Sequence, residues 1–350
     1  MIGNPPYLSS ARGKDPGFRC ALRLCCGLFL AVIWTHNWAE DGVPVPENSS
    51  WSWFAPLAEK SLLLAVGKFG ERMIAVGERG HILYKQGQTP WRQGDVPTQL
   101  LLTGLSFSDE RHGFAVGHDA LILATSDGGQ SWRKAHEAIG EQRPLLDIRF
   151  WNNLSGIAVG AYGYLLRTED GGESWHSGVV HRDHDFHLNA IAIAPDRIYL
   201  AAEAGFVYRS DDQGHHWKVL DPPYDGSFSG IHAIDDNKVM VFGLRGHLFV
   251  SEDAGEHWRA LATGVQSTLT SAITLDNGQF LVIGHGGTLL LVDSSLRRVH
   301  RAQLFDRKAL SDAVQIGPNR ILSVGEGGIR VIDLYRVFMD ALVDRRRQDD

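Results

Sequence analysis

The chain contains little cysteine, and none of it lies in the body of the protein. Of 350 residues, only three are cysteines, and they stand near the N-terminus as Cys20, Cys25 and Cys26. The rest of the chain therefore excludes disulfide frameworks, thiolate metal sites and cysteine nucleophiles. A lipid-modified cysteine is disfavoured too, because Leu24 precedes Cys25 and Arg19 precedes Cys20, where a lipobox has a small residue.

An excess of positive charge is also absent. The 34 basic and 41 acidic residues give a net charge of −7, and no basic stripe runs through the body of the chain. Nucleic-acid binding depends on cationic side chains that neutralise phosphates, so we expect no nucleic-acid partner. The densest basic run, Arg345–Arg347, is expected to be a solvated tail.

The longest apolar run, Leu24–Trp34, is short for a membrane span. Basic residues precede it, and Ala39 offers a cleavage site after it. This order predicts a secretory signal peptide over residues 1–39, with an uncleaved membrane anchor as the alternative. We therefore expect an exported, periplasmic protein, associated with the membrane through its N-terminus if the segment is retained.

One short motif, Ser/Thr-x-Asp-x-Gly-x-x-Trp, is the most conspicuous feature of the chain. Its four copies begin at Thr125, Thr168, Ser210 and Ser251, a spacing of about 42 residues that indicates a repeat architecture. Seven glycine turns of the form Val-Gly-x-x-Gly, or close variants, follow the same spacing. They lie at residues 76–80, 116–117, 159–163, 202–205, 243–246, 284–287 and 325–328. The chain therefore has seven repeats, and the Asp motif marks four of them.

Each repeat has room for four strands. In the third repeat, β-rich runs at residues 145–150, 156–159, 164–168 and 174–176 alternate with turns rich in Gly, Asn and Asp. This pattern predicts an all-β fold, a seven-bladed β-propeller of four-stranded antiparallel blades, over residues 50–335. We expect a tail or short helix over residues 336–350.

The last blade needs an outer strand that its own repeat does not supply. Trp53 lies ten residues before Leu63, as Trp91 lies ten residues before Leu101. We therefore predict that Trp51–Ala55 closes the ring by pairing with the strand around Arg330–Ile332, which would leave no blade edge unpaired.

The Asp motif resembles the Asp-box, or BNR repeat, of sialidases and other propellers. The resemblance implies that the Asp holds the amides of its turn and that the Trp packs between sheets, both of which are structural roles. The residues concerned are Asp127, Trp132, Asp170, Trp175, Asp212, Trp217, Asp253 and Trp258.

The seven repeats, the export signal and the turn followed by the Asp motif together resemble the photosystem II stability/assembly factor family. The resemblance covers roughly residues 50–335 and is clearest at 158–175 and 114–132. It implies a non-catalytic propeller, without a cofactor, that holds subunits of a membrane-protein complex during assembly. It would imply a thylakoid-lumen location in a photosynthetic host. The arginine patch expected of the family is not matched here, because only Arg79 and Arg245 occur in the glycine turns.

Propeller topology predicts where a partner binds. The turns between second and third strands share one face with the connections between blades, whereas the Asp motifs occupy the other face. We therefore expect a partner-binding face of mixed charge and aromatic character, suited to protein recognition, and a monomer with no obligate small-molecule substrate. Its candidate residues are Glu78, Arg79, His118, Asp119, Tyr162, Glu203, Arg245, His285 and Glu326.

Two alternatives involve chemistry. A sialidase-like or other carbohydrate-binding propeller would need clustered Arg, Tyr and Glu in one central pocket, and the sequence shows no such set. A His-rich stretch between the third and fourth repeats offers imidazole and carboxylate ligands for Zn²⁺ or Cu²⁺. A polar surface loop is the competing interpretation of these residues, His181, Asp183, His184 and His187.

Overall fold

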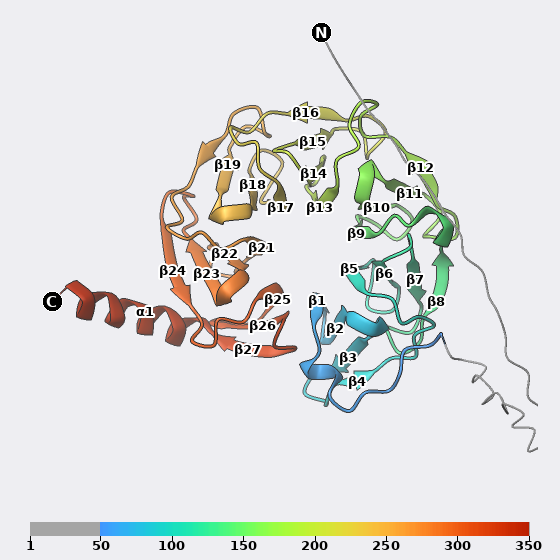
Figure 1. Ribbon diagram of the computed structural model, residues 1–350, viewed down its shortest axis with the longest axis horizontal. Helices are drawn as coiled ribbons and strands as arrows, with labels where there is room; N and C mark the ends of the chain where they lie inside the picture. The colour runs from blue at the N-terminus through green and yellow to red at the C-terminus, as the bar shows by residue number, and fades with distance from the viewer. Residues whose placement is uncertain (1–49, 350) are drawn as a thin grey trace, which may run out of the picture. The chain divides into compact units, whose positions relative to one another are not determined.

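Seven antiparallel sheets surround a common centre in the computed structural model, which describes residues 50–349 (Figure 1). This confirms the predicted seven-bladed β-propeller. Within a blade the strands run outward in chain order, and we refer to them as A to D from the centre. The first three blades contain β1 (Leu63–Phe69), β2 (Arg72–Gly77), β3 (Ile82–Gln86) and β4 (Arg92–Gln93); β5 (Leu102–Phe107), β6 (Gly113–Gly117), β7 (Ile122–Thr125) and β8 (Arg133–His136); and β9 (Leu145–Phe150), β10 (Gly156–Gly160), β11 (Leu165–Thr168) and β12 (His176–Gly178).

The remaining blades follow the same order, and the last of them is incomplete. Blades four to six contain β13 (Leu188–Ile193), β14 (Ile198–Ala202), β15 (Val207–Ser210) and β16 (Lys218–Leu220); β17 (Phe228–Ala233), β18 (Val239–Gly243), β19 (Leu248–Ser251) and β20 (Arg259–Ala260); and β21 (Leu269–Thr274), β22 (Phe280–Gly284), β23 (Thr288–Val292) and β24 (Val299–Gln303). Blade seven contains only β25 (Leu310–Gly317), β26 (Arg320–Gly325) and β27 (Arg330–Asp333).

The core lies between the blades rather than within one layer. Every residue of β10, β14 and β22 is buried, because each sheet is covered on both sides by its neighbours. The motif tryptophans contribute to these interfaces. Trp132 of blade two packs against Ile74 and Ile82 of blade one, and Trp175 of blade three meets Phe114 of blade two edge to face.

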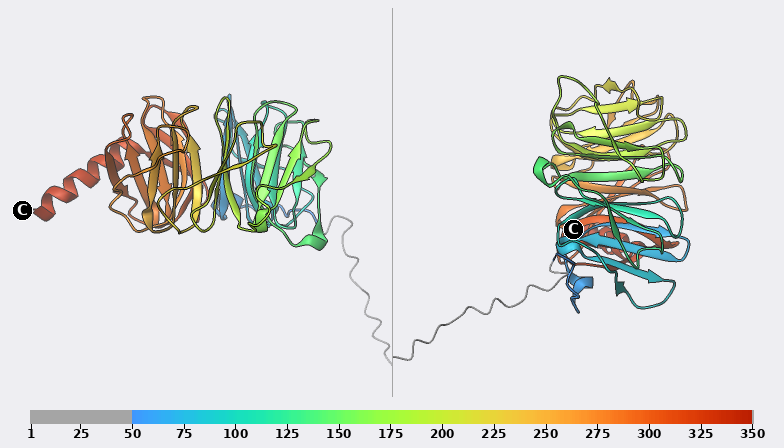
Figure 2. Two further views of the ribbon diagram at one scale, coloured as in Figure 1. Left: turned by 90° about the horizontal axis from the view of Figure 1, so that it is seen from above. Right: turned by 90° about the vertical axis from the view of Figure 1, so that its right-hand side faces the viewer.

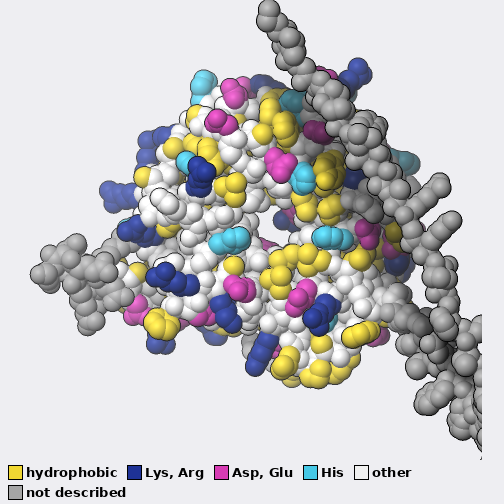
Figure 3. Space-filling model, in the orientation of Figure 1, with side chains coloured by type: hydrophobic (Ala, Val, Ile, Leu, Met, Phe, Trp, Pro, Cys, Tyr) yellow, Lys and Arg dark blue, Asp and Glu magenta, His cyan; other side chains and the backbone are white. Residues whose placement is uncertain are grey.

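The glycine turns form one face of the ring. In all seven blades the first residue of the B–C turn donates its backbone N–H to the carbonyl just before strand A; Glu78 to Leu62 and Glu326 to Ala309 are examples. Several turns form short 3-10 helices: η2 (Glu78–Gly80), η4 (Ala161–Gly163), η5 (Leu244–Gly246) and η6 (His285–Gly287). They lie on one side of the ring in Figure 2, and Figures 1 and 3 look onto that side. We call it the B–C face.

The Asp motifs form the opposite face, the Asp-box face, and each one satisfies its own turn. Asp127 accepts hydrogen bonds from the backbone N–H groups of Gln130 and Ser131 at 2.9 and 3.0 Å. The Thr125 hydroxyl donates to the same carboxylate and accepts from the Gly129 N–H. Equivalent bonds surround Asp170, Asp212 and Asp253. Hydrogen bonds from Ser174 lower the pKa of Asp170.

The predicted closing strand is wrong. β27 pairs only with β26 among the described residues, and Trp53 is 70% exposed. Its segment lies along blade one instead, where the Gln93 side-chain amide donates to the Trp53 carbonyl at 2.7 Å. Pro56 follows two residues after Phe54 and lacks the N–H that a continuing ladder would need.

The two ends of the ring meet through their inner strands. β1 packs beside β25, and a shared apolar cluster joins Leu63 and Val66 of blade one to Leu322 and Val324 of blade seven. The short helix η1 (Ala58–Lys60) completes this junction, since the Ile329 N–H donates to the Glu59 carbonyl at 2.8 Å.

A helix, α1 (Leu334–Asp349), follows β27 without a break. Its residues Leu334, Val337 and Phe338 pack against Leu304, at the end of β24, and against Ile332. None of the helices in the described chain is both long and apolar enough to cross a membrane. The remaining helix, η3 (Ile139–Glu141), lies in the connection between blades two and three.

Candidate partner-binding face

The candidate residues from the glycine turns all lie on the B–C face, but three of them have structural partners. The carboxylates of Glu78, Glu203 and Glu326 accept backbone N–H groups just before strand A of their own blades, from Leu62, His187 and Ala309 at 3.1 to 3.2 Å. Each glutamate therefore ties its B–C turn to the incoming connection. We regard these three as positioning residues of the face.

Other candidates present their side chains to solvent from a left-handed backbone. Arg79, Tyr162 and Arg245 have φ values of 56°, 56° and 55° and are exposed, and Asp119 has φ 57°. This conformation costs a residue with a Cβ about 1 kcal/mol. These exposed side chains take little part in the packing of the blades, although the Tyr162 ring meets that of His187 with centroids 4.9 Å apart. His118 and His285 are exposed on the same face.

Exposed apolar side chains gather on this face. Those in its turns and blade connections, or in the segment before blade one, are Trp53, Phe54, Leu57, Leu62, Ile139, Tyr162, Val179, Leu244 and Phe305. Hydrophobic side chains are spread over this view of the surface in Figure 3. Within the described residues, the turns of the Asp-box face contribute only Leu154 to the large exposed apolar side chains.

The Asp-box face is dominated by ion pairs. Arg209 bonds both Asp211 and Glu256 at 3.0 Å, and Lys218 reaches the same Glu256 at 2.6 Å. Further pairs join Arg167 to Glu169 and Arg133 to Glu173. Charged side chains that are already paired with each other contribute little to binding a partner. A partner that covered them would remove their water, and this desolvation costs about as much free energy as the ion pair gains.

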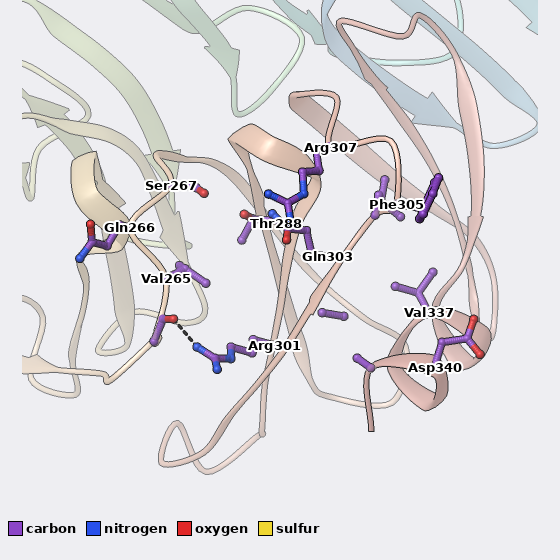
Figure 4. A pocket seen from close by; sticks show the side chains of 14 residues that line it. Val265, Gln266, Ser267, Thr288, Arg301, Gln303, Phe305, Arg307, Val337 and Asp340 are labelled. Carbon is purple, nitrogen blue, oxygen red and sulfur yellow. Dashed lines mark hydrogen bonds between the residues drawn. The ribbon is translucent and has the colours of Figure 1, made fainter. Parts of the chain in front are cut away.

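A cleft of about 860 Å³ opens at the rim of the B–C face, beside blade six (Figure 4). One wall is the connection before β21, and the other is the connection after β24 together with α1. Arg301 donates across the cleft to the Gly264 carbonyl. Phe305 and Arg307 are exposed at its edge, and Val337 and Asp340 of α1 close it. The added helix thus makes a concavity that the propeller alone would lack.

The centre of the ring holds a second cavity, of about 590 Å³, lined by the innermost strands. Asp147 and Arg149 form an ion pair of 2.9 Å there, and burial raises the pKa of Asp147. Burial lowers the pKa of His232 to about 4. No Tyr or Glu lines this cavity among the described residues, whereas a sialidase-type centre needs both. The cavity therefore does not supply that chemistry.

The His-rich stretch does not assemble a metal centre. His181 and His184 stack with ring centroids 3.7 Å apart, and His184 Nδ1 lies 2.9 Å from the Tyr208 hydroxyl. His187 pairs with Glu203 at 3.0 Å instead. No group of three or more His, Cys, Asp or Glu residues that could hold an ion occurs in the described part of the chain. The rings of His181 and His184 are thus brought together, but His187 is paired with Glu203 and, with Asp183, these residues form no group of three ligands.

Comparison with known families identifies the propeller. The profile of the family described as "Photosynthesis system II assembly factor YCF48" matches residues 83–144 and 135–303, which is more than half of the chain. The chain belongs to the YCF48 family. The resemblance inferred from its motifs is thereby confirmed.

Named members of the YCF48 family match only in part. The "Photosystem II assembly lipoprotein Ycf48" of Prochlorococcus marinus (strain MIT 9313) is 42% identical over 133 residues, 37% of this chain and 40% of the relative. The protein of the same name from Trichormus variabilis is 36% identical over 151 residues, 43% of this chain and 44% of the relative. The alignments thus span less than half the length of these relatives.

Solved structures establish the fold alone. "YCF48 bound to D1 peptide" superposes with a TM-score of 0.63 at 16% identity, covering 78% of this chain and 91% of that one. YCF48 from Cyanidioschyzon merolae gives 0.64 at 15% identity, covering 81% and 98%. The WD40 propeller domain of Doa1 gives the same score at 11% identity, covering 81% and 95%. Such likeness therefore does not separate one propeller family from another.

Sequence reasoning missed two features of the face. It assigned Trp53 to the outer strand of the last blade, although the run Trp-Ser-Trp-Phe-Ala-Pro at residues 51–56 combines aromatic residues with a proline that ends strands. It also missed the rim cleft, because α1 and the connection after β24 meet only in the folded chain. The near-helical apolar spacing after Leu334 was the available signal for the helix.

Proposed function

We propose that this protein is a non-enzymatic, exported scaffold that binds a subunit of a membrane-protein complex while the complex is assembled. Membership of the YCF48 family supports this, since relatives carry names of photosystem II assembly proteins. The structural neighbour "YCF48 bound to D1 peptide" supports peptide recognition by such a propeller. Several relatives are named lipoproteins, which supports an exported, membrane-associated location.

One observation carries the proposal, namely the difference between the two faces. The B–C face exposes apolar and aromatic side chains, and the Asp-box face pairs its charges internally. Protein-binding surfaces are distinguished by exposed aromatic anchors and by contiguous apolar area. We therefore assign partner binding to the B–C face, with Arg79, His118, Asp119, Tyr162, Arg245 and His285 presented to the partner and Glu78, Glu203 and Glu326 fixing the turns.

A comparison of the two faces tests this assignment. The double substitution Tyr162→Ser with Leu244→Ser removes two exposed apolar side chains of the B–C face. Leu154→Ser removes one from the Asp-box face and is the matched control. Each tagged variant is used to capture proteins from detergent-solubilised membranes of the source cells, and quantitative mass spectrometry compares the captured membrane proteins.

The wild type and Leu154→Ser should recover the same membrane-protein subunits, and the double variant should recover about tenfold less, since two apolar anchors are lost. Equal recovery by all three proteins would contradict the assignment of the face. Recovery of no membrane protein by the wild type would contradict the function itself.

A further inference from the structure

An uncharged stretch rich in aromatic residues precedes blade one. From Ser50 to Ala58 the chain reads Ser-Trp-Ser-Trp-Phe-Ala-Pro-Leu-Ala. Trp53, Phe54 and Leu57 are 70%, 82% and 64% exposed. We call residues 51–57 the aromatic segment. Three bulky apolar side chains so close together in one short segment form a patch that a soluble domain seldom leaves to water.

The backbone of the aromatic segment is fixed to blade one. The Ser52 N–H donates to the Val96 carbonyl at 2.9 Å. The Gln93 side chain both donates to the Trp53 carbonyl, at 2.7 Å, and accepts from the Ala55 N–H, at 3.0 Å. Gln99 donates to the Trp51 carbonyl at 2.9 Å. Because hydrogen bonds hold the backbone on both sides of Trp53 and Phe54, the exposure of these side chains is built into the fold.

The aromatic segment lies on the outside of blade one (blue in Figure 1), with its apolar side chains exposed. It lines neither the rim cleft nor the central cavity. Exposed charges of both signs lie close to the segment: Glu59 and Lys60 follow it in the chain, and the backbone carbonyl of the exposed Arg79 accepts a hydrogen bond from the Ser52 hydroxyl at 3.0 Å. Such a site has no strong charge preference, so burial of apolar area would drive its binding.

We propose that the aromatic segment contacts a lipid surface, with Trp53, Phe54 and Leu57 entering the interfacial layer of a bilayer. Exposed Trp and Phe side chains are suited to that layer, where the ring lies in an apolar phase and the Trp N–H stays near water. The apolar run Leu24–Trp34, expected to meet a membrane during export, lies a short way upstream in the chain.

The contact would orient the B–C face relative to the membrane. Three such side chains give weak, reversible binding, comparable to that of a single acyl chain. The inference goes beyond the proposed protein-binding function and does not depend on it, because lipid alone is the ligand.

Fluorescence quenching by lipid tests the proposal on the full chain. Vesicles of zwitterionic phosphatidylcholine, with bromine atoms on the upper acyl chain, quench only those Trp side chains that enter the bilayer. Trp53→Phe keeps an apolar ring in the segment but removes its emission. The wild type should therefore be quenched more than Trp53→Phe, because any quenching of Trp34 and Trp38 in the N-terminal segment is common to both proteins.

Two further variants show whether the neighbouring side chains act together. Phe54→Ser with Leu57→Ser should raise the lipid concentration needed for half-maximal quenching of Trp53 by about a hundredfold, or about tenfold for each side chain. Phe305→Ser removes an even more exposed aromatic residue, which follows the outer strand of blade six, and should change nothing.

Equal quenching of the wild type and Trp53→Phe would overturn the proposal, and the segment would then be left to a protein partner. That result would leave the membrane-capture experiment on Tyr162 and Leu244 unaffected, so failure of the lipid contact and failure of the scaffold function can be told apart.

Discussion

The Asp312 carboxylate accepts a hydrogen bond from the Val66 backbone N–H at 2.9 Å, and 246 residues separate the two in sequence. The bond joins the innermost strand of blade seven to that of blade one. The other oxygen of Asp312 accepts from the Ser271 hydroxyl and from the Ala313 N–H. Asp147 makes the equivalent bond between blades three and four, to the Ile191 N–H at 2.9 Å. The carboxylate of Asp312 thus closes the ring by the same kind of hydrogen bond that Asp147 forms between two neighbouring blades.

Asp312→Ala should loosen the closure of the ring. It leaves the N–H groups of Val66 and Ala313 without their acceptor, and each buried unpaired group costs about 1–3 kcal/mol of unfolding free energy. Hydrogen exchange should become faster in β1 and in β25 to β27. Asp147→Ala is the matched control, and its loss of protection should be confined to β9 and β13. If both variants gave the same exchange pattern, the closing role of Asp312 would be refuted.

The Asp-box carboxylates should make stability fall in acid. Hydrogen bonds from the backbone N–H and the ring of His257 lower the pKa of Asp253 to about 2, from 3.8. A carboxylate with a lowered folded pKa stabilises the fold above its unfolded pKa, and that contribution is lost as the pH falls toward the folded pKa. The melting temperatures of the wild type and Asp253→Asn should differ at pH 5 and converge near pH 2. A difference that stayed constant over this range would argue against the ionised Asp253 as its source.

Removing an Asp-box carboxylate should destabilise the blade without altering binding. Asp127→Ala leaves the N–H groups of Gln130 and Ser131 without their acceptor; because both bonds are exposed and water can replace the carboxylate, the cost should be about 1 kcal/mol. Chemical denaturation measures the change, and the exposed Asp221 gives a control, Asp221→Ala, that should alter stability by less than about 0.5 kcal/mol. Lost partner capture by folded Asp127→Ala would show that the motif also takes part in binding.

Arg245→Gly should separate stability from function. Arg245 has φ 55° and is exposed, so glycine would relieve about 1 kcal/mol of backbone strain, offset in part by the greater entropy of the unfolded chain. We expect an unchanged or slightly raised melting temperature together with weaker capture of the membrane partner. Unchanged capture would remove Arg245 from the binding face. Blade six already has glycine at this turn position, Gly286 with φ 64°, which shows that the turn accepts the residue.

Much of the fold could be predicted because its signals are local. The Asp motif satisfies amides within five residues of itself, and the glycine turns need a left-handed backbone wherever they occur, so both features repeat with the blades. The position of Trp53 could not be predicted in this way. Its spacing from Leu63 equals the spacing of Trp91 from Leu101, which predicts a strand. In the folded chain, however, the backbone around Trp53 bonds to Gln93 and Val96, in and just after the outer strand of blade one.

The sequence by itself determined the number of blades, the orientation of the ring and the face that the Asp motifs leave unoccupied, because each depends on short-range turn chemistry repeated seven times. Only the tertiary structure decided how the ring closes, which glutamates of the B–C face act as positioning residues, and where apolar side chains remain exposed. These features depend on contacts between residues far apart in the chain. No sequence periodicity predicts such contacts, because they form only once the chain has folded; the bond from Val66 to Asp312, for example, requires the two ends of the propeller to meet.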